Sequence, residues 1–461
     1  MPLLILLCAA QLMVILDISA VNVALPSLST DLGIAPGDLE WTITSYSLLF
    51  GSLLLLGGRA ADLLGRRRVF LAGLAIFTGA SAAAALAPTA GALYAARAGQ
   101  GIGAALLSPA ALSIVTTAFT GAARTRALAV WGAVGGAGGA IGVLLGGVLT
   151  DVIDWRAIFF VNLPIGAIVA VGVLRSVRRD AAPPRFAGLD LRGALIATAS
   201  LGALLYGLAG ASDAGWGSAR TLAFGGAGLA GLALFAALER RTARPLVRLG
   251  ALADRAVGGG AALMLLASAV LFGAFLLTSI YLQEILRATP LEAGLEFLPI
   301  AVATGLGAHG AGHLVRRHGV RATMALAFAL AATGMTLMST VGASGSYVAD
   351  VLPWMLVAGA GLGMAMVSVA IAILTGASEQ DAGMLSGLNT TGHEVGGAFG
   401  VAVLTTAVAG AQGGLVDGLG DAFLTAAGIA GGGLVLALLV LPAAGRFLPR
   451  LREAPQAVTM H

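Results

Sequence analysis

Long apolar runs follow one another along almost the whole chain, with short polar connections between them. A membrane-spanning helix needs about 20 predominantly apolar residues. Fourteen stretches meet this requirement, and they lie near 3–25, 41–61, 69–87, 91–115, 127–150, 158–174, 192–210, 221–238, 257–282, 293–314, 322–341, 351–374, 385–410 and 421–444. No basic segment precedes the first run, which continues to Leu25, so we interpret it as a span and not as a signal peptide.

The composition excludes a soluble fold. Charged residues make up 10% of the chain, against about 25% in soluble domains. The 68 glycines allow close helix packing in lipid. The net charge of +4 does not indicate a nucleic-acid partner, because the basic residues lie in connections between spans. A single cysteine, Cys8, rules out a disulfide framework. We therefore predict an all-α polytopic membrane protein.

The distribution of arginine predicts the topology. If the N-terminus is cytoplasmic, the outer connections contain only Arg156, Arg220 and Arg287, whereas the inner connections contain the arginine clusters. Cytoplasmic loops of membrane proteins carry an excess of basic residues. We therefore expect both termini in the cytoplasm and the chain in the plasma membrane of a bacterial cell.

Two longer inner connections, 175–191 and 239–256, divide the spans into groups of six, two and six, and the first contains Pro183-Pro184. The pattern Gly58-x6-Gly65-Arg66 recurs as Gly312-x6-Gly319, followed by Arg321, and the glycine-rich run 132–147 has a counterpart at 392–400. Parallel repeats of this kind are typical of transporters. We predict an N-terminal six-helix bundle at 1–180, a linker pair of spans at 181–250, a C-terminal six-helix bundle at 251–445 and a cytoplasmic tail at 446–461.

Several motifs resemble those of one transporter family. They are Leu16-Asp17-x3-Val21-Asn22, Gly58-x3-Asp62-x2-Gly65-Arg66-Arg67-Arg68, Leu93-x3-Arg97-x2-Gln100-Gly101, Trp155-Arg156-x2-Phe159-x2-Asn162 and Asp190-x2-Gly193. In order and position they resemble the major facilitator superfamily and, within it, the fourteen-span drug:proton antiporters of multidrug efflux, over nearly the whole length. The resemblance implies the major facilitator fold, two pseudo-symmetric bundles plus two linker spans, and export of a lipophilic compound by alternating access against inward proton flow.

One departure bears on the direction of transport. The antiporter motif of the fifth span normally reads Gly-Pro, but here Val143 follows Gly142, and only the spacing of Gly138, Gly142, Gly146 and Gly147 remains. We expect these glycines to pack the fifth span closely on its neighbours. A dedicated exporter of one endogenous metabolite and a symport importer therefore stay open as alternatives. A multispan membrane enzyme would need convergent acids or a metal cluster, and the sequence shows neither.

Asp17 and Arg97 are the first candidates for proton coupling. An ionisable residue inside a span usually marks a proton or substrate path. At 1.5 Å rise per residue, both lie roughly 9–12 Å below the outer surface, so a salt bridge that protonation of Asp17 releases is possible. Gln100, one turn after Arg97, completes the network or bonds a neighbouring helix. The family resemblance likewise links the arginine of this motif to proton coupling.

Glu394 and the connection after the second span are further candidates. Glu394 is either a second proton site, a counter-charge for a cationic substrate or an interfacial acid. In the loop at 58–68 we expect Asp62 to meet the positive N-terminus of a helix in the opposite half and to act in gating with Gly58, Gly65, Arg66 and Arg67.

The sequence predicts no cofactor. Glycine pairs such as Gly101-x-Gly103 lie within spans without a Walker lysine, which argues against ATP-driven transport. His309 and His313 lie one helical turn apart without an evident third ligand, so we expect no metal site. The expected partners are protons, the lipid bilayer and a small lipophilic substrate, cationic or neutral, and we expect a monomer to be the functional unit.

Overall fold

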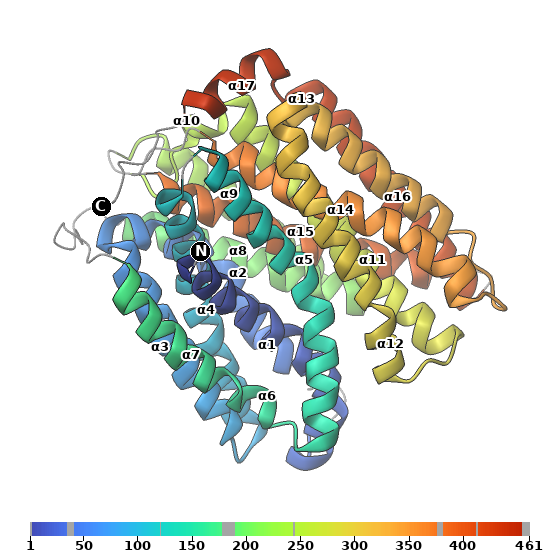
Figure 1. Ribbon diagram of the computed structural model, residues 1–461. Helices are drawn as coiled ribbons and strands as arrows, with labels where there is room; N and C mark the ends of the chain where they lie inside the picture. Colours follow the sequence, from blue (N-terminus) through green and yellow to red (C-terminus); the bar gives the residue numbers. More distant parts are fainter. Residues whose placement is uncertain are drawn as a thin grey trace.

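The computed structural model describes residues 2–34, 41–119, 121–177, 190–242, 245–375, 381–411 and 414–453. Within these ranges helices are the only regular secondary structure, joined by short turns and connections (Figure 1). Pro183-Pro184 and the predicted boundary at 180–181 lie outside the described residues. The helices of the N-terminal part are α1 (Pro2–Leu32), α2 (Trp41–Leu64), α3 (Arg66–Ala85), α4 (Ala90–Ala118), α5 (Gly121–Val152), α6 (Ala157–Phe160) and α7 (Asn162–Ser176).

The remaining helices form a hairpin and a second bundle. The hairpin consists of α8 (Leu191–Ala214) and α9 (Ala219–Glu239). The side chain of Asp190 caps α8 by accepting a hydrogen bond from Gly193 N at 2.8 Å. The second bundle contains α10 (Leu249–Leu252), α11 (Arg255–Ile280), α12 (Pro290–Glu296), α13 (Leu298–Met338), α14 (Leu352–Leu374), α15 (Ala382–Gly410), α16 (Leu415–Val440) and α17 (Ala444–Glu453).

The described helices agree with the predicted spans. Eleven are long and apolar enough to cross a membrane. Helices α5 and α15, of 32 and 29 residues, add two more, and a kink divides α13 into two spans. The fourteen predicted spans are therefore accounted for in the described part of the chain, although several boundaries differ. The first helix, for example, continues to Leu32 and not to Leu25.

The predicted loop at 58–68 is wrong in its extent. Gly58 and Asp62 belong to α2, Arg66 and Arg67 belong to α3, and Gly65 alone interrupts the helices, with φ 103° and ψ 129°. Gly319 has φ 80° and ψ 169° within α13, so the equivalent connection of the second bundle is also one residue. Such backbone angles are open to glycine and unfavourable for other residues. The repeated glycines therefore mark one-residue hinges.

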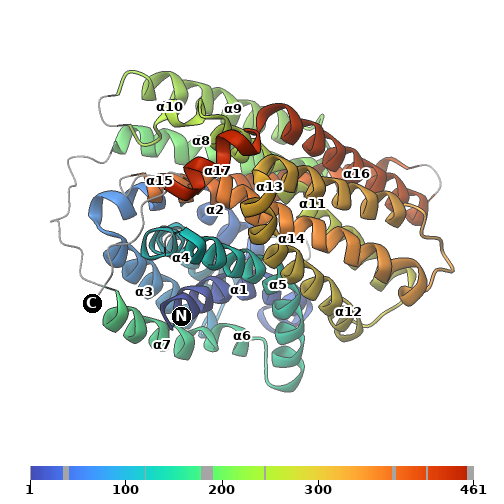
Figure 2. The same ribbon diagram turned by 45° about the horizontal axis from the view of Figure 1, so that its top comes forward.

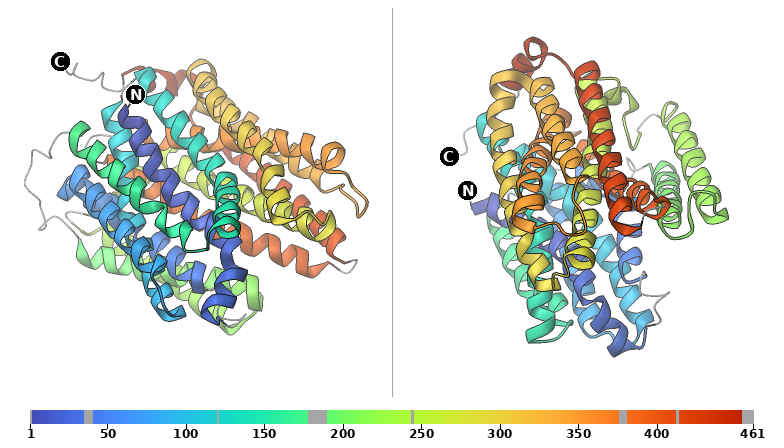
Figure 3. Two further views of the ribbon diagram at one scale, coloured as in Figure 1. Left: turned by 60° about the horizontal axis from the view of Figure 1, so that its bottom comes forward. Right: turned by 90° about the vertical axis from the view of Figure 1, so that its right-hand side faces the viewer.

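The two bundles pack in the same way. In the first, α2 and α3 contact α4, and α1 contacts α5; in the second, the two parts of α13 contact α14, and α11 contacts α15. Between the bundles, α5 lies against α13 and α15 lies against α2. Figures 2 and 3 show the α8–α9 hairpin at the side of the molecule, outside both bundles. The fifth span of each half thus joins the second span of the other half.

The glycines of α5 allow α1 to approach closely. A Cβ added at Gly138 would lie 2.7 Å from Ile15 Cγ2, and one at Gly146 would lie 2.6 Å from Ala20 Cα. Gly142, between them, faces Ser19 and Leu16. Gly147 is buried as well. The small residues therefore bring α5 against the segment of α1 that carries Asp17, because a larger side chain would separate the backbones.

We expect Gly319→Ala to destabilise the protein. The positive φ is strained for alanine by about 1–3 kcal/mol, and the new Cβ would lie 2.8 Å from Ala444 Cα. Gly310→Ala is the matched control on the same helix, because a Cβ there meets nothing within 4 Å, and alanine favours a helix by up to about 1 kcal/mol. Thermal unfolding in detergent should show a lower midpoint for Gly319→Ala only. Equal midpoints for both variants would contradict the hinge assignment.

Candidate functional site

Asp17, Arg97 and Gln100 form one buried polar cluster. Asp17 is 1% exposed on α1, and Arg97 and Gln100 are 0% exposed on α4. Arg97 Nη1 donates to Asp17 Oδ2 and, at 2.9 Å, to Gln100 Oε1. Gln100 Nε2 donates to Asp17 Oδ1 at 2.7 Å. A spacing of three residues places Arg97 and Gln100 on one face of α4, so one turn of α4 supplies two partners for the carboxylate.

Other helices complete this cluster. Asn162 Nδ2, at the start of α7, donates to Asp17 Oδ1 at 3.0 Å and to Ser81 Oγ at 3.2 Å. Gln100 Nε2 also reaches Ser81 Oγ on α3 at 2.8 Å. Arg97 Nε donates to the carbonyl oxygen of Thr42 on α2 at 2.9 Å. The Asp17 carboxylate therefore accepts hydrogen bonds from three side chains.

Aromatic rings enclose the guanidinium of Arg97. Its Cζ lies 4.5 Å from the centre of the Tyr46 ring and 5.9 Å from that of Phe159. Cation–π contacts of this kind stabilise a desolvated cation by about 2 kcal/mol or more. Removing one partner of a buried ion pair destabilises a protein by about 3–5 kcal/mol. The charge state of Asp17 is therefore strongly coupled to the packing around Arg97.

The sequence predicted the contact between Asp17 and Arg97, and the structure contains it. Its role in proton coupling stays a prediction. Ser81, Tyr46 and the Thr42 carbonyl were not predicted. Asn162 stood in a recognised motif without a role. A buried amide in an apolar run is a signal for such a role, whereas Ser81 and Tyr46 resemble ordinary helix residues until the rotation of each helix is known.

Glu394 lies apart from the Asp17 cluster in the hydrogen-bond network, but close to it. It is half-buried on α15, and its Cβ is 3.7 Å from where a Cβ on Gly51 of α2 would lie. Tyr46, one helical turn before Phe50 on α2, is within electrostatic reach of both Asp17 and Glu394. The neighbouring His393 shares a hydrogen bond of 2.7 Å with Ser268. Glu394 of the second bundle thus lies against α2 of the first bundle.

Asp62 joins the two bundles at one end of the molecule. Its Oδ1 accepts from Gly383 N at 2.8 Å, and its Oδ2 accepts from Met384 N at 2.9 Å. These amides begin α15, so the carboxylate caps a helix of the opposite half, as the sequence predicted. Gly58 permits this approach, since a Cβ there would lie 3.1 Å from Gly387 Cα. We call this contact the Asp62 latch; its role in gating stays a prediction.

The arginines of the predicted loop support this end of the bundle in different ways. Arg66 Nη2 lies 3.8 Å from Asp62 Oδ1. Arg67 Nη2 donates to the carbonyl oxygen of Leu174 at 2.8 Å and so joins α3 to the end of α7. Arg66 thus contacts the latch, whereas the bond from Arg67 to Leu174 joins two helices of the N-terminal bundle.

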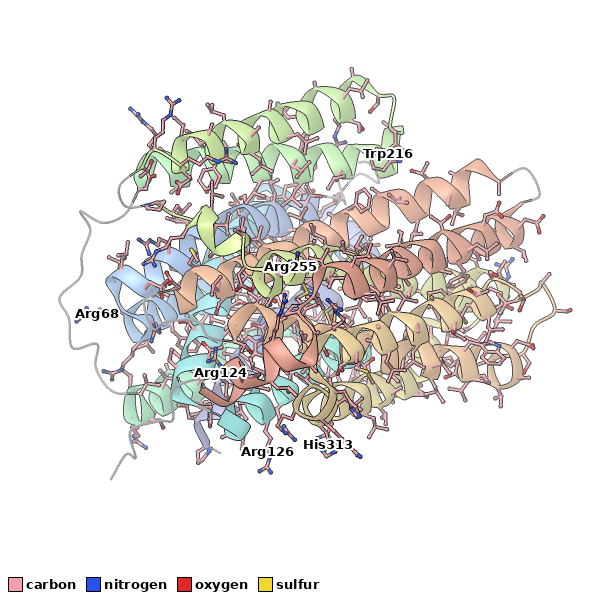
Figure 4. The ribbon with its side chains drawn as sticks, turned by 90° about the horizontal axis from the view of Figure 1, so that it is seen from above. Arg68, Arg124, Arg126, Trp216, Arg255 and His313 are labelled. Carbon is pink, nitrogen blue, oxygen red and sulfur yellow. The ribbon has the colours of Figure 1, made fainter. Side chains whose placement is uncertain are left out.

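A further contact joins the halves at the same end. Arg124 of α5 donates to the carbonyl oxygen of Leu374, the last residue of α14. Arg248, which precedes α10, forms an ion pair of 3.2 Å with Asp381 beside α15 and so holds the connection after α9 against the second bundle. Figure 4 shows Arg68, Arg124 and Arg126 toward one end of the helices and Trp216 toward the other. The described structure is therefore closed at the Asp62 end.

Metal ligands do not gather in the described residues. No group of three His, Cys, Asp or Glu side chains there is placed to hold a metal ion. His309 and His313 lie together on α13, as the sequence predicted from their spacing.

Comparison with known families and proteins decides the relationship. The Major Facilitator Superfamily profile matches residues 7–401. The cephamycin export protein of Amycolatopsis lactamdurans is 40% identical over 458 residues, covering 97% of this chain and 93% of that protein. The chain belongs to the Major Facilitator Superfamily. It is a multi-pass membrane transporter and not an enzyme.

Other members of the superfamily agree with this assignment. The puromycin resistance protein of Streptomyces alboniger is 38% identical and covers 88% of this chain and 82% of that protein. The multidrug resistance protein Stp of Mycobacterium tuberculosis is 33% identical and covers 86% and 74%. Among solved structures, the proton:xylose symporter XylE superposes with a TM-score of 0.67 at 15% identity, covering 98% of each chain. This last similarity supports the superfamily fold alone.

We expect Asp62→Ala to open the Asp62 end of this transporter. Each hydrogen bond to a charged group contributes about 1.5–3 kcal/mol, so loss of two raises the open population about a hundredfold or more. In a Cys8→Ala background, Ser386→Cys places a reporter thiol at a position of α15 that is 0% exposed. The rate of its modification by a hydrophilic maleimide measures opening.

Asp31→Ala is the control for this experiment. Asp31 pairs with Arg156 at 2.8 Å and accepts a hydrogen bond from Trp155 at 3.2 Å, and both partners belong to the N-terminal bundle. Its loss should leave the modification rate unchanged. If Asp62→Ala also leaves the rate unchanged, the latch does not hold the two halves together.

Proposed function

We propose that this transporter exports small drug-like compounds from the cell in exchange for protons. Three relatives support export as the direction, since their names describe cephamycin export, puromycin resistance and multidrug resistance. The observation that carries the proton coupling is the buried Asp17–Arg97 pair. An intramembrane ion pair with a titratable acid can store and release a proton without a cofactor.

The coupling follows from the partners of Asp17. As an anion, the carboxylate accepts hydrogen bonds from Arg97, Gln100 and Asn162 and holds α1, α4 and α7 together. Protonation removes the negative charge and leaves Arg97 buried without its counter-ion, which is costly in an apolar interior. The bundle then favours a conformation in which Arg97 finds another partner or water. Proton binding thereby changes the relative stability of the two facing states.

The other step of the transport cycle, opening at the Asp62 end, is controlled by the Asp62 latch. It stabilises the state that is closed at its own end, through hydrogen bonds from Gly383 and Met384. We assign this end to the cytoplasm on the basis of its arginines. Rocking of one bundle against the other would break the latch and open the transporter to substrate from inside the cell. Both bundles are needed, because α5 and α15 reach across to the opposite half.

Substrate breadth has two candidate answers. The relatives include a protein named for one compound and another named for many, so a dedicated exporter remains the second candidate. A dedicated exporter and an exporter of many compounds both need a lipophilic pathway between the bundles. In this pathway Glu394 is either a counter-charge for a cation or a second proton site, because it lies on α15 beside α2 where the halves meet.

We expect Asp17→Asn to uncouple transport from the pH gradient. The amide cannot lose a proton, so uptake into inverted proteoliposomes under an imposed gradient should fall to the level seen when the gradient is collapsed. Downhill exchange of the substrate should continue, provided that the thermal midpoint shows a folded protein. Asp31→Asn, a carboxylate 46% exposed, is the control and should behave as wild type. Gradient-driven uptake by Asp17→Asn at the wild-type rate would refute the coupling.

Glu394→Gln should distinguish the two roles of that acid. If Glu394 is a counter-charge, it attracts cationic substrates only, so the variant would lose transport of a lipophilic cation and keep that of a neutral compound. If Glu394 is a proton site, the variant would lose gradient-driven transport of both the cation and the neutral compound. We expect the first result, since Glu394 lies outside the hydrogen-bond network of Asp17. The paired measurement uses ethidium and a neutral antibiotic of similar size.

A further inference from the structure

A basic cavity of about 500 Å³ lies at one end of the C-terminal bundle. Helices α11, α13 and α17 and the segment after α16 meet there. Its lining includes three arginines, one carboxylate and an apolar wall, which are Arg255, Arg321, Arg446, Asp254, Pro442 and Ala443. None of these residues belongs to the Asp17 cluster or to the Asp62 latch. The cavity is therefore separate from the two sites of the proposed transport cycle.

The guanidinium groups of this cavity are held in place but not neutralised. Arg321 Nε donates to the carbonyl oxygen of Leu441 at 2.6 Å and so fixes its side chain at the end of α16. Arg255 and Arg446 are exposed. Within the described part of the chain, none of the three arginines forms an ion pair. The local charge is therefore strongly positive.

Asp254 offsets only part of this charge. Its side chain caps α11, accepting a hydrogen bond from Ala256 N at 2.8 Å. A capping carboxylate is stabilised by the helix N-terminus. Three guanidinium groups thus face one carboxylate that is already engaged. Arginine binds phosphate oxygens through paired N–H groups, so the cavity fits a phosphate-bearing anion.

The position of the cavity favours a lipid as the source of that phosphate. Helix α11 begins at Arg255 and α16 ends at Val440, so the cavity is level with the membrane surface. Helix α17 lies across the end of the bundle (Figure 1), with Phe447 buried and Arg446 exposed. Amphipathic helices of this kind lie in the membrane interface, and basic pockets beside spanning helices bind acidic lipid head groups.

We propose that this cavity binds the phosphate group of an anionic ligand, and that an acidic phospholipid head group occupies it in the membrane. Pro442 and Ala443 then contact the glycerol and upper acyl region, while Arg255, Arg321 and Arg446 contact the phosphate. The bound lipid joins α11, α13 and α17 at their ends. It thereby stabilises the C-terminal bundle against separation of these helices.

The test is a lipid titration of the purified full-length protein in detergent, followed by its thermal unfolding midpoint. Phosphatidylglycerol should raise the midpoint saturably, and phosphatidylcholine should not. Each arginine near a membrane surface strengthens binding about fivefold. The double variant Arg255→Gln/Arg446→Gln should therefore need about 25-fold more phosphatidylglycerol for half-saturation. Both side chains are exposed, so the variant should fold.

Two controls are needed. One distinguishes loss of charge from loss of the arginine side chain, and the other distinguishes the cavity from the rest of the surface. Arg317→Gln removes an exposed arginine of α13 that does not line the cavity and should leave the titration unchanged. Arg255→Lys/Arg446→Lys keeps the charge and should retain most of the response. An equal response to phosphatidylcholine, or an unchanged titration of the double glutamine variant, would overturn the proposal.

Inorganic phosphate distinguishes a soluble ligand from a lipid. The same titration with phosphate in lipid-free micelles should give no saturable shift if the acyl region contributes to binding. A saturable shift that the double glutamine variant loses would assign the same cavity to a soluble phosphate compound and would overturn the lipid assignment. The test measures stability alone, so its result does not depend on whether the transporter exports drugs.

Discussion

A positive charge buried in a membrane protein must be stabilised by protein groups in place of water. For Arg97 these groups come from most helices of the N-terminal bundle. Asp17 of α1 supplies the counter-charge, the Thr42 carbonyl of α2 accepts a hydrogen bond, and Tyr46 covers the guanidinium. Ser81 of α3 accepts a hydrogen bond from Gln100, and Asn162 of α7 donates one to Asp17. Each of these helices is oriented by a group that it presents to one ion pair. Any change in the charge of Asp17 therefore alters the contacts of all these helices with the ion pair.

The symmetry of the fold does not extend to this chemistry. Helix α14 occupies in the second bundle the place of α4 in the first, but its sequence contains no charged residue. Its contact with α13 depends on glycines, such as Gly359 beside Ile300 and Gly361 beside Leu330. The two bundles thus have the same architecture and different interiors. The buried ion pair belongs to the first bundle, whereas α14 presents an apolar surface at the equivalent place in the second.

The sequence predicted the spans from their apolar length and the repeat from its glycine spacing. It predicted the Asp17–Arg97 contact and the contact of Asp62 with a helix N-terminus because a charged group in apolar surroundings needs a partner. It did not predict the single-residue hinges at Gly65 and Gly319, since charged residues such as Arg66 indicate a loop although they continue a helix. It also did not predict Ser81 or Tyr46 as partners. Their participation depends on the rotation of α2 and α3, and apolar helices that are buried on several sides show little periodicity from which rotation could be inferred.

The α8–α9 hairpin makes the two seams between the bundles unequal. Helix α8 contacts both α2 and α15, and Trp216 at its far end donates to Thr406 Oγ1 of α15 at 2.8 Å. The seam between α2 and α15 is therefore screened from the surrounding lipid. At the seam between α5 and α13 the short helix α12 contacts both helices, and the α8–α9 hairpin lies on the other side of the described structure (Figure 2). We therefore expect a lipophilic compound dissolved in the bilayer to enter more readily beside the glycine-rich α5 than at the seam that the hairpin covers.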